Sequence, residues 1–244
     1  MRKKILAVII ILVMILTGVN IPEGSNKLDV HAETMTYTSG VYEYTLNEDG
    51  EANITKFTGN DVNVQIPDDV DGHSVVGLGN SLFANKKTVK SVYIPNTVQT
   101  IGNYAFAGTS VSKLELPKQL KSMGDGMLRE AKGVTEITIP QGVTGAGGAF
   151  AGSSIEKAIL TEGITKIPDS IFRECSTLKE VVIPDSVTVV GDRAFDRCTQ
   201  LSNIHLPNTI TRIEDYAFAV TSLSKLELPK QLKSMGDGML REAK

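Results

Sequence analysis

Apolar residues recur along most of this chain with a period of about 23 residues. Each unit holds an apolar-x-apolar triplet, and this alternation predicts a short strand with one buried face. Proline follows the triplet and suits a strand end, because it has no backbone N–H to donate to a ladder. These prolines are Pro67, Pro95, Pro117, Pro140, Pro184, Pro207 and Pro229, and Leu160-Thr161 takes the missing place.

Six of the seven phenylalanines occupy one position of the unit, and Leu128 takes that position in another unit. A single unit cannot bury its own apolar face, so the pattern predicts an aromatic stack inside a coil of neighbouring units. The expected fold is a β-rich repeat solenoid of about eight rungs of 21–28 residues over 61–244, the last rung incomplete. The predicted spine consists of Phe83, Phe106, Phe150, Phe172, Phe195 and Phe218.

The 20-residue sequence KLELPKQLKSMGDGMLREAK occurs twice without a change, at 113–132 and 225–244. The copies are 112 positions apart, or five units, and their upstream flanks also agree. A stack of interchangeable units tolerates gain of a block, so we interpret the repeat as a block duplication. The sequence stops halfway round a rung, which we interpret as a truncated gene or a fragment.

Residues 33–60 precede the repeats and predict a capping hairpin. The segments VYEYTL and EANITKF flank the turn sequence NEDG. Such a cap keeps the first rung from pairing with other chains.

The unit from 178 to 201, LKEVVIPDSVTVVGDRAFDRCTQL, resembles the BspA-type leucine-rich repeat, a class found on secreted and surface proteins of bacteria. The resemblance covers roughly residues 60–244. It implies a right-handed solenoid with strands on its concave face and a role in adhesion or ligand binding. Thr161 replaces a proline, GVTGAGGAF is one residue short, and GMLREAK lacks the Ala-Phe pair, so we expect looser rungs there.

Residues 1–32 have the pattern of a secretory signal peptide, with three basic residues, an apolar core and a small-residue cleavage site ending at Ala32. The alternative is a membrane anchor, but the apolar core is shorter than the roughly 20 residues that a spanning helix needs. We therefore expect a secreted or cell-surface protein with no membrane span after cleavage. The mature chain would carry 21 Lys and Arg against 26 Asp and Glu, which argues against a nucleic-acid partner.

No catalytic, metal or cofactor site is expected. The sequence contains no Cys-x-x-Cys and no pair of histidines four residues apart. Segments 47–51 and 68–73 look like calcium loops but lack the twelfth-position Glu, so we interpret them as solvated turns. Cys175 and Cys198 lie one unit apart, which favours two buried thiols and leaves a disulfide as the alternative.

Charged residues alternate in sign four positions before successive prolines, which predicts ion pairs that fit neighbouring rungs together. These residues are Lys113, Glu136, Lys157 and Glu180.

The middle residue of each triplet is expected to point away from the core and to form one exposed row. We expect ligand binding at Tyr93, Thr138, Ile159, Val182 and His205, and the row also contains Glu115 and Glu227. Its centre is apolar, which favours an extracellular protein or glycan over a charged polymer. The alternative is that β-branched residues simply suit exposed strands.

The expected function is that of a secreted or cell-surface, non-enzymatic interaction module for adhesion or ligand binding. Two alternatives remain open. The repeats are the targeting arm of a larger exported enzyme whose catalytic domain lies beyond Lys244, or they are a structural spacer in the cell envelope.

Overall fold

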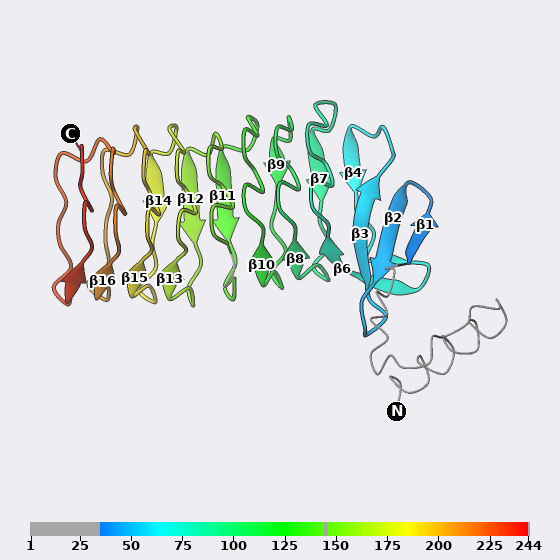
Figure 1. Cartoon of the computed structure of the whole chain (residues 1–244), viewed down its shortest axis with the longest axis horizontal. Coiled ribbons are helices and arrows are strands. Elements are labelled where there is room, and N and C mark those ends of the chain that lie inside the picture. Colours follow the sequence, from blue (N-terminus) through cyan, green and yellow to red (C-terminus); the bar gives the residue numbers. More distant parts are fainter. Residues whose placement is uncertain (1–34, 144–145, 244) are drawn as a thin grey trace, which may run out of the picture. The chain divides into compact units, whose positions relative to one another are not determined.

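The computed structural model describes residues 35–143 and 146–243. The predicted signal peptide, 1–32, lies outside these residues. The described chain consists of strands and turns without a helix, so no described helix could cross a membrane. Its repeats stack in chain order as a β-solenoid of about eight turns (Figure 1), which confirms the predicted fold class.

The apolar triplets form short parallel strands that we call the front ladder. Its partners pair in register, so that Val64, Val92 and Leu114 lie at equivalent positions with their side chains buried. The ladder consists of two groups, β4 (Asn63–Gln65), β7 (Ser91–Tyr93) and β9 (Lys113–Leu114), then β11 (Glu136–Ile139), β12 (Lys157–Leu160) and β14 (Glu180–Val182).

The segment expected to be a turn and returning wall forms a second parallel ladder, which we call the return ladder. Its strands are mostly two residues long, and the second residue of each, such as Ile101 or Val190, is buried. Its two groups are β6 (His73–Leu78), β8 (Thr100–Ile101) and β10 (Ser122–Met123), then β13 (Lys166–Ile167), β15 (Val189–Val190), β16 (Arg212–Ile213) and β17 (Ser234–Met235).

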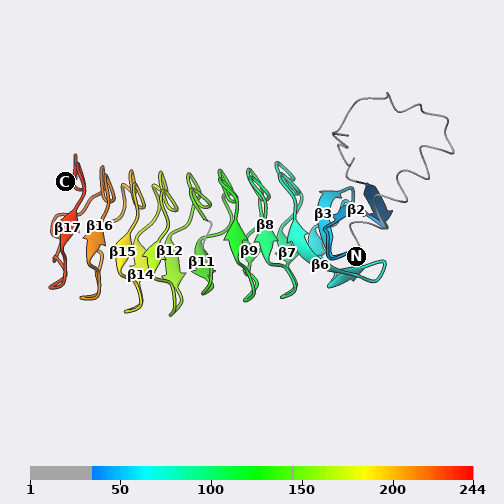
Figure 2. The ribbon, with the colours of Figure 1, turned by 60° about the horizontal axis from the view of Figure 1, so that its bottom comes forward.

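The N-terminal cap contains the predicted hairpin. Strands β2 (Tyr42–Leu46) and β3 (Ala52–Phe57) pair antiparallel, and an additional strand, β1 (Thr36–Ser39), pairs with β2. β3 pairs in parallel with β6, so the cap continues the return ladder, as Figure 2 shows from another side. The short β5 (Asp69–Val70) pairs with β6 on the other side of a tight turn.

The six predicted spine phenylalanines are fully buried and stack in two groups, Phe83 with Phe106 and Phe150 through Phe218. Ring centroids are 5.3 Å apart for Phe83 and Phe106, and 5.7, 5.6 and 5.4 Å apart for successive pairs from Phe150 to Phe218. The seventh phenylalanine, Phe57 of the cap, extends the stack with a centroid 5.3 Å from that of Phe83. The repeat pattern does not predict this position, because Phe57 precedes the first repeat.

The solenoid is irregular in the middle, where the sequence departs from the repeat. Leu128, fully buried, stands between Phe106 and Phe150 and interrupts the stack of rings. In the described residues, β9 does not pair with β11, and β10 does not pair with β13. Backbone hydrogen bonds still cross here, such as Leu128 N–H to the carbonyl of Ala149 at 3.0 Å. The rungs therefore remain stacked while both ladders stop and restart.

Tight corners between the ladders place two residues of each rung in the left-handed region of φ. Glycine suits this region, but Tyr104, Arg193 and Val220 adopt φ values of 56, 51 and 55°. The N–H of the spine residue between the two corners donates to the next rung, as Phe195 does to Ala217 at 2.8 Å. Inter-rung hydrogen bonding thus holds side-chain-bearing residues in a strained conformation.

Candidate binding surface

The exposed row lies along the front ladder. Tyr93 and Val182 are 51% and 43% exposed, large values for apolar side chains in strands. Thr138 is also exposed, whereas Ile159 is half-buried, so the expected apolar centre is less open than its sequence implies. The registers of β4, β7, β11, β12 and β14 fix the spacing of these side chains.

The last two members of the row lie outside regular strands. His205 and Glu227 are exposed as expected, but their segments are not strands, so the sequence expectation of a strand in each rung is wrong there. Ile204 and Leu206 beside His205 are still buried, so the apolar contacts persist without the backbone ladder.

A hollow opens around Tyr93 at the N-terminal end of the row. Its volume is about 350 Å³, and Gln65, Lys113 and Glu115 line it together with the Tyr93 ring. Lys113 and Glu115 are 3.5 Å apart, so their charges largely offset each other. An exposed aromatic ring with neutralised polar neighbours is typical of a binding anchor for proteins or sugars.

The predicted charge ladder is only partly present. Lys157 Nζ lies 3.0 Å from Glu180 Oε1 on the next rung, and the hydrogen bond to Glu180 raises the pKa of Lys157. Lys113 instead pairs with Glu115, just after β9 in its own rung, so the prediction that it pairs with Glu136 is wrong. The reason is the break between β9 and β11, which removes the parallel register that the pair requires.

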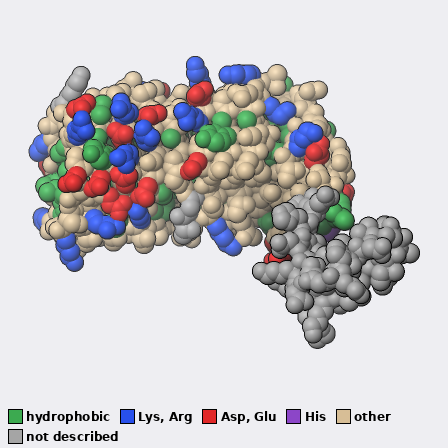
Figure 3. Space-filling model, viewed as in Figure 1, with side chains coloured by type: hydrophobic (Ala, Val, Ile, Leu, Met, Phe, Trp, Pro, Cys, Tyr) green, Lys and Arg blue, Asp and Glu red, His purple; other side chains and the backbone are tan. Residues whose placement is uncertain are grey.

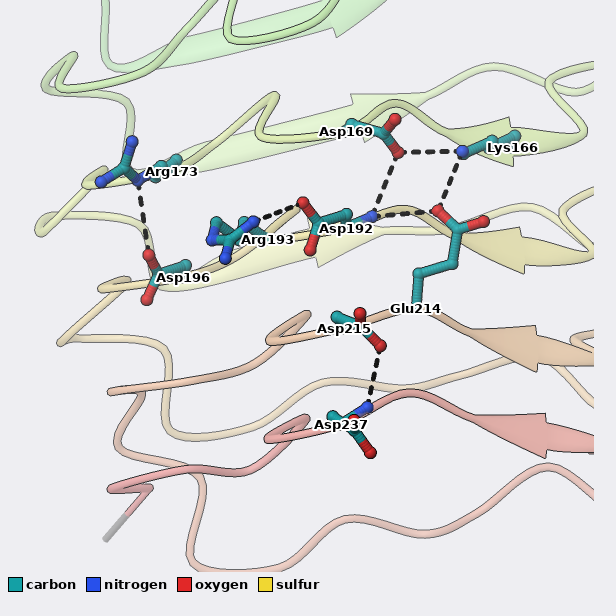
Figure 4. Close-up of polar contacts among 9 residues, drawn as sticks. All are labelled: Lys166, Asp169, Arg173, Asp192, Arg193, Asp196, Glu214, Asp215 and Asp237. Atoms are coloured by element: carbon teal, nitrogen blue, oxygen red, sulfur yellow. Dashed lines mark hydrogen bonds and ion pairs between the residues drawn. The ribbon is translucent and has the colours of Figure 1, made fainter.

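Charged groups gather on the C-terminal half of the return ladder (Figure 4). Lys166 Nζ lies 2.9 Å from both Asp169 and Glu214, and the backbone N–H of Asp192 donates to the same two carboxylates at 3.1 Å. Burial alone would lower the pKa of Lys166, but these two carboxylates raise it; Lys166 in turn holds the pKa of Asp169 below its usual range despite desolvation. Lys166 and its two carboxylates thus connect the rungs of β13, β15 and β16.

The two cysteines are free and fully buried, as the sequence favoured, so the alternative disulfide is absent. The Cys175 thiol donates to the carbonyl of Phe150 at 3.0 Å, and the Cys198 thiol donates to that of Phe172 at 3.2 Å. Burial raises the pKa of Cys175 to about 11 and raises that of Cys198 well above its usual value. Neither thiol is available as a nucleophile at neutral pH.

No group of three or more His, Cys, Asp or Glu side chains within 35–143 and 146–243 is arranged to hold a metal ion. Residues 47–51 and 69–72 form turns closed by their own side chains. The Asn47 side chain accepts from the N–H of Glu51 at 2.8 Å, and Asp69 accepts from that of Gly72 at 3.3 Å.

One polar pattern was missed by the sequence analysis. In most rungs an Asn or Asp follows the return strand by two positions, and its side-chain oxygen accepts from the backbone N–H of the equivalent residue in the next rung. Asn80 accepts in this way from Asn103 at 2.8 Å, and Asp215 accepts from Asp237 at 2.8 Å. The signal was present as an Asx recurring every 22 or 23 residues, with Gly147 in the one missing place, at Asn80, Asn103, Asp125, Asp169, Asp192, Asp215 and Asp237.

The family model described as "BspA type Leucine rich repeat region (6 copies)" matches residues 60–179 and 146–244. A search of curated proteins found no match.

Several solved structures are similar to the chain. A leucine rich cell surface protein from Faecalibacterium prausnitzii A2-165 is 31% identical, with a TM-score of 0.59 over 83% of this chain and 55% of that one. A leucine-rich repeat protein from Bacteroides ovatus ATCC 8483 has 24% identity and a TM-score of 0.67 over 84% of this chain and 62% of that one. The second likeness concerns the fold alone. The chain thus spans between 55% and 62% of the length of these two proteins.

Proposed function

Because the chain belongs to the BspA-type leucine-rich repeat family, we propose that it is an exported, cell-surface interaction module that binds an extracellular protein through its exposed row. Repeats of this kind are typical of protein-interaction modules, since each rung adds to a continuous surface. A cell-surface relative that is 31% identical over most of this chain supports the proposed location.

The observation that carries the proposal is the row itself. Tyr93 and Val182 expose large apolar side chains on paired strands, so a partner can bury them without first ordering the backbone. Charged groups around them, such as Glu115 and Glu180, are exposed and suit a polar rim. Interfaces of this composition depend on a few aromatic and aliphatic anchors surrounded by weaker contacts.

The test introduces the same substitution, valine to aspartate, once inside and once outside the exposed row. Val182→Asp puts a charge in the row, whereas Val62→Asp puts the same charge at a side chain that is 49% exposed outside it. Binding of the full chain to a panel of immobilised extracellular-matrix proteins should weaken at least tenfold in Val182→Asp, about 1.4 kcal/mol, and stay unchanged in Val62→Asp. Tyr93→Ala and the double variant Ile159→Asp, Val182→Asp should act in the same direction.

Circular dichroism confirms that each variant is folded. A folded double variant that still binds with the affinity of the parent would exclude the row as the site. If this face binds glycans but none of the proteins, the partner is a sugar and the proposed protein partner is wrong.

Export is tested separately. Expression of the full gene in a secreting bacterium should release a chain whose first residue is Glu33, as determined by mass spectrometry of the intact protein. A cell-associated chain that retains residues 1–32 would contradict cleavage.

A further inference from the structure

A second hollow lies on the return ladder, where the cap meets the first rungs. Its volume is about 540 Å³, the largest of the hollows described for this chain. Strands β3, β6, β8 and β10 pass side by side beneath it (Figure 1), and the turn between β2 and β3 borders it. We call it the asparagine groove, after its polar lining of Asn47, Asn53, Asn80, Gln99 and Asn103.

One outward position at the groove carries no side chain, and the side chain of Asn53 lies over it. Gly77 of β6 pairs with Thr100 of β8, which pairs with Ser122 of β10. A Cβ added to Gly77 would lie 2.5 Å from Asn53 Oδ1 and 3.0 Å from Thr100 Oγ1. The φ of Gly77 is not in the left-handed region, so its backbone does not require glycine. Glycine at position 77 therefore leaves room for the Asn53 side chain, which lies directly over it.

The C-terminal half of the same ladder shows the contrast. There the outward positions carry Lys166, Val189 and Arg212, and their side chains and ion pairs occupy the surface. Figure 3 shows acidic and basic side chains gathered over the C-terminal rungs, and mainly uncharged surface toward the middle of the solenoid. Hollows on the C-terminal half are lined by charged residues such as Lys166 and Arg212, so a nearly uncharged polar lining is a local property of the first rungs.

The amides of the groove have fixed orientations. Asn80 Oδ1 and Asn103 Oδ1 accept from backbone N–H groups at 2.8 and 2.9 Å, so their NH₂ groups are the ends left to donate. Asn47 Oδ1 accepts from two backbone N–H groups of its turn and is held in the same way. The side chains of Asn53 and Thr100 also line the groove, beside Gly77. The groove therefore offers preset donors together with further polar side chains.

The charge and shape of the lining limit the ligand. Glu51 is the single charged side chain that lines the described groove, so nothing there compensates a phosphate or a polyanion. Strands β3, β6 and β8 of the floor are already paired on both sides, so they offer no free backbone edge to a peptide strand. A neutral ligand with many hydroxyl groups fits, since each hydroxyl both donates and accepts.

We propose that the asparagine groove binds a neutral oligosaccharide. Consecutive rungs are about 4.8 Å apart, so amides on successive rungs can each meet hydroxyls of neighbouring sugar rings. Glycine at position 77 lets the Asn53 amide lie close to the sheet, where it can also meet a hydroxyl. The groove shares no residue with the exposed row, so this binding is independent of the proposed protein partner.

The experiment titrates the full chain with a panel of neutral soluble oligosaccharides, followed by calorimetry and by NMR of Asn side-chain amides. The amide signals of Asn80 and Asn103 should shift with at least one sugar. Gly77→Val displaces the Asn53 side chain by a residue that this ladder position already accepts at Val189, and it should weaken binding at least tenfold. Ser234→Val makes a matched change on β17, outside the groove, and should leave binding unchanged.

Asn53→Ala provides a second variant in case Gly77→Val does not fold, and should weaken binding several-fold. Absence of binding by any panel sugar at millimolar concentration would overturn the proposal. So would unchanged affinity in folded Gly77→Val or in Asn53→Ala, or groove binding by peptides but not by sugars.

Discussion

The identical segments 113–132 and 225–244 have different environments. Met123 is 3% exposed and its equivalent Met235 is 55% exposed; Leu128 and Leu240 differ in the same way, at 0% and 40%. The first copy is covered by the rung that begins at Gly133, whose carbonyl of Gly148 accepts from Gly126 N–H at 2.9 Å. Burial in this solenoid is therefore set by the neighbouring rung and not by the sequence of the rung itself.

The largest expected effect comes from the spine. Phe172→Ala removes a ring stacked on both sides and should lower the free energy of unfolding by about 3–5 kcal/mol. Phe218 has one stacked aromatic neighbour in the described chain, so Phe218→Ala should cost less. Denaturant unfolding measures both. A loss below about 1 kcal/mol at Phe172 would show that the stacked rings do not stabilise the core.

The two leucines make the comparison within identical sequence. Leu128→Ala should cost about 2–5 kcal/mol, because it opens a cavity in a packed core. Leu240→Ala should cost less than about 1 kcal/mol, because its side chain is already partly in water. Equal costs in denaturant unfolding would mean that the terminal rung is covered in solution.

Amide hydrogen exchange compares the backbone hydrogen bonding of the two identical segments. In the first copy, Leu128 N–H is bonded to Ala149, whereas no described rung lies beyond Leu240. We expect the Leu240 amide to exchange at least about 100-fold faster, a difference of about 2.7 kcal/mol in local opening. Residues 235–243 as a group should follow the same trend relative to 123–131. Equal protection of the two amides would contradict an open terminal rung.

The smallest expected effect lies just upstream of the two identical segments, where Gly108 and Val220 occupy equivalent positions. Both have a positive φ, 63° at Gly108 and 55° at Val220, but only glycine adopts such a φ without steric strain. Val220→Gly should stabilise the chain by about 1 kcal/mol, since relief of backbone strain exceeds the entropy that glycine costs. Gly108→Val should destabilise it, because its Cβ would lie 2.5 Å from Asn85 Oδ1. Thermal unfolding of both variants shows whether each gains or loses stability. A loss of stability in Val220→Gly would contradict backbone strain at Val220.

Much of the fold could be predicted from the sequence because the signals were local and repeated. The prolines, the phenylalanine position and the hairpin turn each depend on a few adjacent residues. The return ladder was harder to predict, since strands of two residues such as Thr100–Ile101 are too short to show alternation. The failed pair of Lys113 and Glu136 required a register that a nearby irregular rung removes.

The exposed row could be predicted from local sequence patterns, whereas the asparagine groove could not. Alternate residues of a strand point to opposite faces, so the members of the exposed row could be predicted from the sequence. The half-burial of Ile159 could not be predicted in this way. The asparagine groove combines side chains of the cap with those of three later rungs. No local pattern shows that Asn53 lies over Gly77, because that contact depends on how the cap pairs with β6.

The interrupted middle of the solenoid also has a mechanical consequence. Along most of the chain, two ladders and a column of rings share any load applied between the ends, but near Leu128 both ladders stop and the rings are replaced by one aliphatic side chain. Under tension the molecule should part there first, before the four-stranded group from β13 to β17. The block that contains the cap and the block that contains β11 to β17 would then extend as separate steps in a pulling experiment.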